Sequence, residues 1–103
     1  MSNQNVKEAT IQKWVQDKLK KAFGEDIYIF KIPQGQYTSR RGIADLCMCI
    51  KGQYAAIEVK TDSGRLTALQ DHEMSKVKRS GATAITIYGK DEGLLKAFIK
   101  QFK

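Results

Sequence analysis

The stretch IADLCMCIK (43–51), GQ (52–53) and YAAIEVKT (54–61) decides the fold of this chain. Two runs rich in apolar residues, separated by only two residues, are typical of a β-hairpin. Gly52 stands at the first position of the intervening pair, which favours a type II′ turn. We therefore predict two antiparallel strands over residues 43–51 and 54–61, with Lys51 and Tyr54 flanking the turn.

This hairpin places three charged side chains on one face of the predicted sheet. In the register that the turn implies, Asp45 lies opposite Lys60. Cys47 then lies opposite Glu58. Because side chains alternate along a strand, Asp45, Glu58 and Lys60 project from the same side of the sheet. The other side receives the apolar residues expected in the core, which are Leu46, Met48, Ile50, Ile57 and Val59.

The segments outside the hairpin are predicted as three helices and two further strands. Apolar residues recur at helical spacing over 7–23, 67–80 and 91–102. Short β-branched and aromatic runs predict strands over 27–32 and 82–88, and a polar loop covers 34–42. The resulting order, αβββαβα, predicts an α/β fold in one domain, residues 1–103, with a mixed sheet flanked by helices.

The composition favours an intracellular protein with a polyanionic partner. The chain carries 18 Lys and Arg against 11 Asp and Glu, a net charge of +7. This excess favours nucleic acid, because phosphate contacts release condensed counterions, although solubility alone also explains it. No apolar run approaches the roughly 20 residues that span a bilayer, and the polar first residues do not form a signal peptide. Cys47 and Cys49 are expected to be small buried residues in a reducing compartment.

The three charged residues of the hairpin suggest metal-assisted chemistry. Carboxylates clustered within strands are costly unless they are paired or bind a metal. Asp45 and Glu58 supply two oxygen ligands of the kind that Mg²⁺ or Mn²⁺ takes. A water held by such a metal can act as a nucleophile, and Lys60 is placed to orient or deprotonate it, or to neutralise charge on a phosphate. The alternative is a structural Asp45–Lys60 ion pair on a solvated face.

Asp45 and Glu58-Val59-Lys60 resemble the D…(D/E)-x-K signature of the PD-(D/E)XK nuclease superfamily. The strings GIADL (42–46), IEVKT (57–61) and GRLT (64–67), followed by Gln70, resemble its virus-type replication-repair nuclease (VRR-NUC) branch. That branch is similar to archaeal Holliday-junction resolvases. The resemblance runs from about Glu8 to Ile87. One departure is Ala44, which stands where the superfamily's name has a proline.

The resemblance implies a restriction-endonuclease-like αβββαβ core, here with an extra C-terminal helix. It also implies a metal bound by Asp45, Glu58 and the backbone carbonyl of Val59, with Lys60 acting on the attacking water. Glu8 matches the acid that the family places on its first helix near the metal. A glutamate in the first turn of a helix is also favourable by itself, so both interpretations of Glu8 stay open.

Gln70 matches a helix glutamine of the family's active site. Thr67 and Gln70 also have the spacing of a capping box, in which the glutamine side chain bonds the backbone at the start of the helix. These two roles are expected to compete for one side chain.

Five residues are candidates for DNA contacts. Arg40 and Arg41 precede the strand of Asp45, and a guanidinium group suits phosphate oxygens, although two solvated loop arginines are the alternative. Tyr37, in the same loop, and Ser63 and Arg65, in the loop after the hairpin, are further candidates.

The sequence therefore predicts a Mg²⁺- or Mn²⁺-dependent DNA endonuclease of one domain. The resemblance to junction resolvases suggests branched DNA as substrate, and two equivalent sites suggest a homodimer. The alternatives are a non-catalytic nucleic-acid-binding module of the same fold, or a nuclease with another substrate, including RNA.

Overall fold

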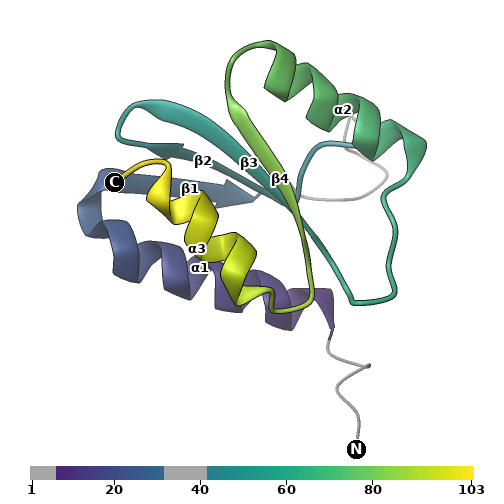
Figure 1. Cartoon of the computed structure of the whole chain (residues 1–103), viewed down its shortest axis with the longest axis horizontal. Coiled ribbons are helices and arrows are strands. Elements are labelled where there is room, and N and C mark those ends of the chain that lie inside the picture. Colours follow the sequence, from purple (N-terminus) through teal and green to yellow (C-terminus); the bar gives the residue numbers. More distant parts are fainter. Residues whose placement is uncertain (1–6, 32–41) are drawn as a thin grey trace, which may run out of the picture.

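The computed structural model describes residues 7–31 and 42–103, and its elements follow the order predicted from the sequence (Figure 1). A short 3₁₀ turn, Gly24–Asp26, separates the first helix from the first strand. The helices are α1 (Glu8–Phe23), α2 (Ala68–Arg79) and α3 (Glu92–Lys100), and the strands are β1 (Ile27–Lys31), β2 (Leu46–Ile50), β3 (Gln53–Lys60) and β4 (Thr83–Tyr88). The predicted α/β fold is confirmed.

The four strands form one mixed sheet in the order β1-β2-β3-β4. Strand β2 is antiparallel to both β1 and β3, and β4 is parallel to β3. Because parallel neighbours need a crossover connection, α2 lies between β3 and β4 in the sequence and packs on the sheet. The sheet thus positions the C-terminal end of β3 beside the start of β2, where the charged residues lie.

The predicted register of the β2–β3 hairpin was wrong by two residues. Leu46 pairs with Ile57 and Ile50 pairs with Gln53, so the turn consists of Lys51 and Gly52. Their φ angles are 51° and 83°, and positive φ at both central residues defines a type I′ turn rather than the predicted II′. Moving the turn by one residue changes each pairing by two, which preserves the face on which every side chain lies.

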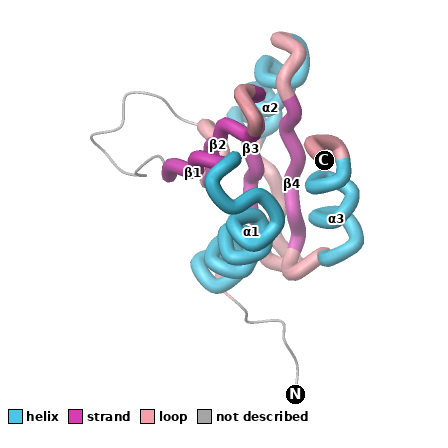
Figure 2. Tube along the Cα trace, turned by 90° about the vertical axis from the view of Figure 1, so that its left-hand side faces the viewer, coloured by secondary structure: helices cyan, strands magenta, loops and turns pink. Residues whose placement is uncertain are grey.

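The main core fills the side of the sheet covered by α1 and α3, which lie next to each other on the same face (Figures 1 and 2). The five residues predicted for the core of the hairpin are all fully buried there. The cluster consists of Ile11, Val15, Leu19, Phe23, Leu46, Met48, Ile50, Ala55, Ile57, Val59, Ile87, Leu95, Phe98 and Phe102.

The other side of the sheet carries a much smaller core under α2. It consists of Ala44, Ala56, Met74 and Ala84, and Val77 packs against it. Helix α2 contacts β3 and β4, and the part of this face formed by β1 and β2 keeps exposed side chains. Cys47 is buried as predicted, but Cys49 is exposed, because α2 does not extend over it. None of the helices in the described ranges is long and apolar enough to cross a membrane.

Candidate active site

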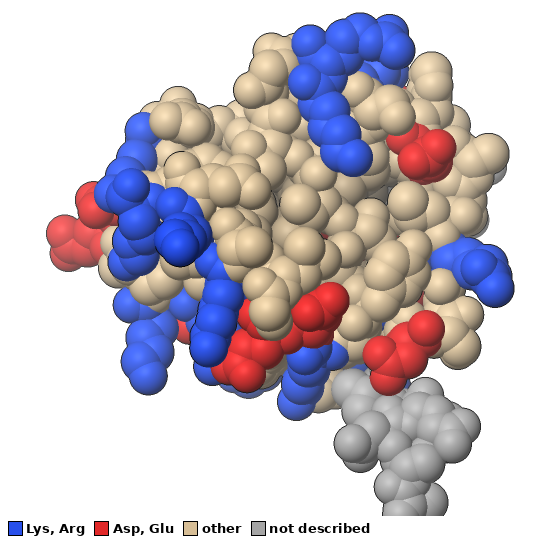
Figure 3. Space-filling view, viewed as in Figure 1, with Lys and Arg blue, Asp and Glu red and all other residues tan. Residues whose placement is uncertain are grey.

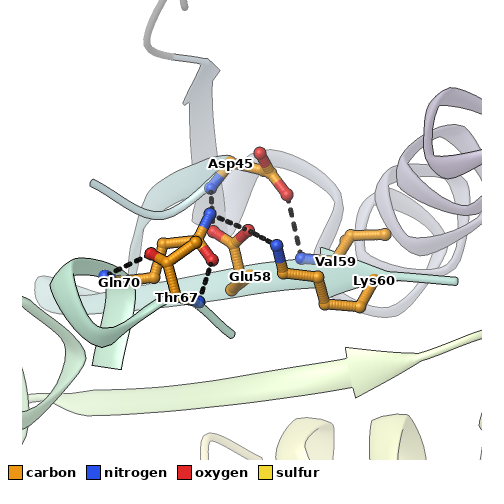
Figure 4. Close-up of polar contacts among 6 residues, drawn as sticks. All are labelled: Asp45, Glu58, Val59, Lys60, Thr67 and Gln70. Carbon is orange, nitrogen blue, oxygen red and sulfur yellow. Dashed lines mark hydrogen bonds and ion pairs between the residues drawn. The ribbon is translucent and has the colours of Figure 1, made fainter. Parts of the chain in front are cut away.

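Two hydrogen bonds between carboxylates and backbone N–H groups join the segment just before β2 to the end of β3 (Figure 4). The Asp45 backbone N–H donates to Glu58 Oε1 at 3.1 Å. The Val59 backbone N–H donates to Asp45 Oδ2 at 3.0 Å. Asp45 lies just before β2, in the bend that leads into the strand, so its carboxylate can reach the backbone of β3. The two carboxylates are thereby held side by side.

Lys60 pairs with Glu58 rather than with Asp45. Its Nζ lies 3.6 Å from Glu58 Oε2, and the whole residue is only 9% exposed. The structural alternative considered from the sequence, an Asp45–Lys60 cross-strand ion pair, depended on the incorrect register. In the observed register these two residues are offset along the strands. Asp45, Glu58 and Lys60 nevertheless share one face of the sheet, as predicted.

Gln70 forms the predicted capping box and also contacts Glu58, while a catalytic role for it stays a prediction. The Gln70 side-chain Oε1 accepts from the Thr67 backbone N–H, and the Gln70 backbone N–H donates to Thr67 Oγ1, both at 3.0 Å. These two bonds form a capping box. The Gln70 Nε2 donates to Glu58 Oε2 at 3.1 Å. A side-chain amide has a separate donor and acceptor, so one glutamine can cap α2 and hold Glu58 at the same time.

Glu58 is the residue whose ionisation this environment opposes most. It is 1% exposed, and its pKa is raised from 4.5 to about 7, chiefly by burial. The negative charge of Asp45 contributes to this rise, and the positive charge of Lys60 opposes it. Around neutral pH the pair of carboxylates therefore favours a proton or a cation between them.

We expect the metal-free protein to lose stability as the pH rises from 4.5 to about 7, because the unfolded chain releases the Glu58 proton before the folded chain does. The loss attributable to Glu58 should reach about 3 kcal/mol, since each unit of pKa shift corresponds to about 1.4 kcal/mol. Chemical denaturation in the presence of a chelator, repeated at several pH values, measures it.

The Glu58→Gln variant is the control for this measurement, because a glutamine does not titrate. Subtracting its unfolding free energy from that of the wild type removes the contributions of all other carboxylates. Identical pH profiles for the two proteins would contradict the assignment of a raised pKa to Glu58.

No third acidic side chain is gathered around this pair in the described part of the chain. Glu8 lies partly exposed in the first turn of α1. Within residues 7–31 and 42–103, no group of three His, Cys, Asp or Glu side chains is arranged to hold a metal ion. Val59 contributes its N–H to Asp45, and a role for its carbonyl stays a prediction, as does a role for Glu8.

The predicted DNA contacts fall in two parts of the chain. Tyr37, Arg40 and Arg41 lie outside the described residues. Ser63 and Arg65 are exposed in the connection between β3 and α2, directly after Lys60. Contact of any of them with DNA stays a prediction.

Gly42 is a positioning residue for which the sequence analysis predicted no role. Its φ is 81°, and a Cβ atom there would lie 2.7 Å from the Leu69 carbonyl oxygen. Leu69 belongs to the first turn of α2, next to Gln70. The segment leading to Asp45 therefore packs directly against the turn that holds Glu58, and only a glycine permits this approach.

Replacing Gly42 by alanine should lower the free energy of unfolding by about 3 kcal/mol, from backbone strain plus displacement of the Leu69 backbone. Gly52→Ala is the matched control, because its φ is 83° and no atom lies within 4 Å of the added Cβ. It should cost only about 1 kcal/mol, the strain of the left-handed region alone. Urea denaturation of both variants measures the difference, and equal losses would show that the Leu69 contact is unimportant.

Comparison with known proteins gives structural relatives only. No family model and no curated protein matches the chain. A solved structure described as a VRR_NUC domain matches with a TM-score of 0.72 at 20% identity, over 93% of this chain and 97% of that one. A VRR_NUC domain protein matches with a TM-score of 0.71 at 19% identity, over 95% and 88%. Hjc of Archaeoglobus fulgidus, a Holliday junction resolvase, matches with a TM-score of 0.58 at 18% identity, over 79% and 67%.

Proposed function

We propose that this chain, which has the restriction-endonuclease-like fold of VRR_NUC domains, is a nuclease that hydrolyses DNA phosphodiester bonds with a divalent metal ion. The observation that carries this proposal is the pairing of Asp45 with the buried Glu58, beside Lys60, at the junction of β2 and β3. Buried carboxylates that share a site are typical of catalytic or metal-binding centres.

The residues present fit a hard divalent cation such as Mg²⁺ or Mn²⁺. The carboxylates of Asp45 and Glu58 lie side by side, and the buried Glu58 has a raised pKa. A cation bound between them would take the place of the proton that Glu58 loses near neutral pH. Asp45, Glu58 and the Val59 carbonyl would hold the ion. When bound, it would supply positive charge to the scissile phosphate and acidify a water molecule.

The chain's own residues perform the remaining steps of the proposed reaction. Gln70 and the Asp45 N–H each hold one Glu58 oxygen, which fixes the direction of that carboxylate. Lys60, close to Glu58 and largely shielded from solvent, would orient the attacking water or offset charge developing on the phosphate. This arrangement requires no histidine or cysteine.

Branched DNA is the proposed substrate, acted on by a homodimer. The net charge of +7 suits a polyanion. The last turn of α2 carries the exposed basic residues Lys76, Lys78 and Arg79, and Figure 3 shows Lys and Arg side chains gathered on the surface over this helix. The resolvase activity named for the Hjc structure supports a branched substrate. One catalytic pair cuts one strand, so paired cuts need two copies of the chain.

Incubation with labelled linear, flapped and four-way DNA tests the proposal directly. Cleavage is expected with Mg²⁺ or Mn²⁺, strongest on the branched substrates, and none is expected in EDTA. Binding without cleavage under every metal condition would indicate a non-catalytic module of the same fold. Light scattering at micromolar concentration should give the mass of a dimer, and a monomer that makes paired symmetric nicks would contradict the dimer.

A further inference from the structure

The part of the sheet that α2 leaves uncovered carries three exposed aromatic side chains. Tyr28 is 70% exposed, Phe30 is 38% exposed and Tyr54 is 41% exposed. The rings of Tyr28 and Phe30 lie next to each other, with centroids 5.9 Å apart and planes tilted by 35°. We call Tyr28, Phe30 and Tyr54 the aromatic face. An exposed apolar patch of neighbouring rings, unlike single scattered apolar residues, is often a binding surface.

The aromatic face leads directly to the candidate active site. Two rows of paired residues cross β1, β2 and β3 on this side of the sheet, Tyr28–Cys49–Tyr54 and Phe30–Cys47–Ala56. One further step of two residues along β2 and β3 brings Asp45 and Glu58. With about 3.3 Å per residue and about 4.8 Å between strands, Phe30 lies roughly 12 Å from Glu58 along the sheet.

A hollow lies between Tyr54 of the aromatic face and the segment that leads to Asp45. It has a volume of about 160 Å³ and lies between α2 and the sheet, next to Tyr54 and Ala56. Its lining includes Ala44, which directly precedes Asp45, and Met74 of α2. The hollow exists because the sheet presents alanines to α2, so the helix does not fill the space.

We propose that the aromatic face stacks the bases of an unpaired nucleic-acid strand whose backbone runs to Asp45 and Glu58. This inference rests on the proposed nuclease function and specifies its substrate as one with a single-stranded arm. Every base has a flat apolar face that stacks on an aromatic ring whatever the sequence. Roughly 12 Å is a span of only a few nucleotides, so bases stacked there belong to the strand being cut.

The charge and size of the surface favour a nucleic acid over a second copy of the chain. The overall charge of +7 attracts phosphates. The three rings together expose about 300 Å², if a fully exposed ring presents about 200 Å². A stable protein interface buries about 800 Å² on each partner. The rings alone are therefore too small an area for a dimer, but they suit two or three bases.

Fluorescence anisotropy of labelled oligonucleotides tests the inference, with the full chain in EDTA so that nothing is cut. Tyr28→Ser and Phe30→Ser should each weaken binding of a single-stranded oligonucleotide about tenfold, the fold-change typical of losing one base–aromatic stack. Binding of a blunt duplex of the same sequence should change less than twofold. Tyr28→Trp should restore binding of the single strand.

Leu94→Ser is the matched control, since Leu94 is also exposed but lies on α3, on the opposite side of the sheet. It should bind both oligonucleotides like the wild type. Photo-crosslinking of an oligonucleotide that carries iodouracil, followed by peptide mass spectrometry, should locate the base at Tyr28 or Phe30. DNA and RNA versions of the oligonucleotide identify the sugar that the face accepts.

Two outcomes would overturn the inference. One is a single-strand affinity that stays within twofold of wild type in both serine variants. The other is a fall in molecular mass when Tyr28 is changed, since it would identify the aromatic face as a protein interface. The proposed nuclease function fails separately, because it is refuted by absence of cleavage with Mg²⁺ or Mn²⁺ even if single-strand binding behaves as expected.

Discussion

Asp45→Asn and Glu58→Gln are each expected to lower DNA cleavage at least about a thousandfold, equivalent to roughly 4 kcal/mol of barrier. The reason is that each variant removes one of the two negative ligands proposed for the metal ion. Both variants should fold, because an amide oxygen can still accept the hydrogen bonds from the Val59 and Asp45 backbones. Single-turnover cleavage of a flapped duplex and of a four-way junction, each with Mn²⁺, measures the loss.

DNA binding should persist in these variants and can become tighter, because removing a carboxylate lowers the repulsion of phosphates. Asp71→Asn is the matched control: the same chemical change at an exposed position in the first turn of α2 should leave cleavage within twofold of wild type. Cleavage by either active-site variant at more than about a tenth of the wild-type rate, about 1.4 kcal/mol of barrier, would disprove the assignment.

Lys60→Ala should lower turnover by about 10² to 10⁴-fold, the range found for a group that positions or transfers a proton in the reaction. Metal affinity should stay the same or increase, because a positive charge 3.6 Å from Glu58 opposes a second cation. Calorimetric titration with Mn²⁺ and single-turnover kinetics measure the two quantities separately.

Lys60→Met keeps most of the side-chain volume and separates the loss of charge from the loss of packing. Lys60→Met should be as inactive as Lys60→Ala, but its melting temperature should be higher than that of Lys60→Ala. Lys90→Ala, at an exposed position in the loop after β4, should behave like the wild type. If Lys60→Ala is unfolded and Lys60→Met is folded and active, Lys60 has only a structural role.

The sequence predicted the shared face of the charged residues although it predicted their partners incorrectly. The position of the hairpin turn decides which residues are opposite each other, and Lys51 adopts a positive φ that a sequence pattern does not favour for lysine. The alternation of side chains survives a shift of two residues, so Asp45, Glu58 and Lys60 stayed together. Predictions that rest on alternation were therefore robust, and those that rest on register were not.

Contacts between segments far apart in the sequence could not be derived from it. The Gln70–Glu58 bond and the Gly42–Leu69 contact depend on how closely α2 approaches the sheet. The exposure of the aromatic rings of β1 could not be predicted from the sequence either. Strand β1 is apolar on both faces, and its sequence does not show that α2 covers only β3 and β4. Spacing locates chemistry along a strand, whereas the extent of helix coverage decides which side chains reach solvent.

The small, alanine-rich core under α2 holds this helix to the sheet less strongly than the main core holds α1 and α3. Three of its four buried members are alanines, which make few dispersion contacts compared with the leucines and isoleucines on the opposite side of the sheet. Regions with few buried apolar contacts open at lower free energies than the rest of a protein. Helix α2 can thus detach while the remaining sheet, α1 and α3 stay folded. Each such opening would release Gln70 from Glu58, so we expect the proposed active-site geometry to be lost by detachment of this helix more often than by global unfolding.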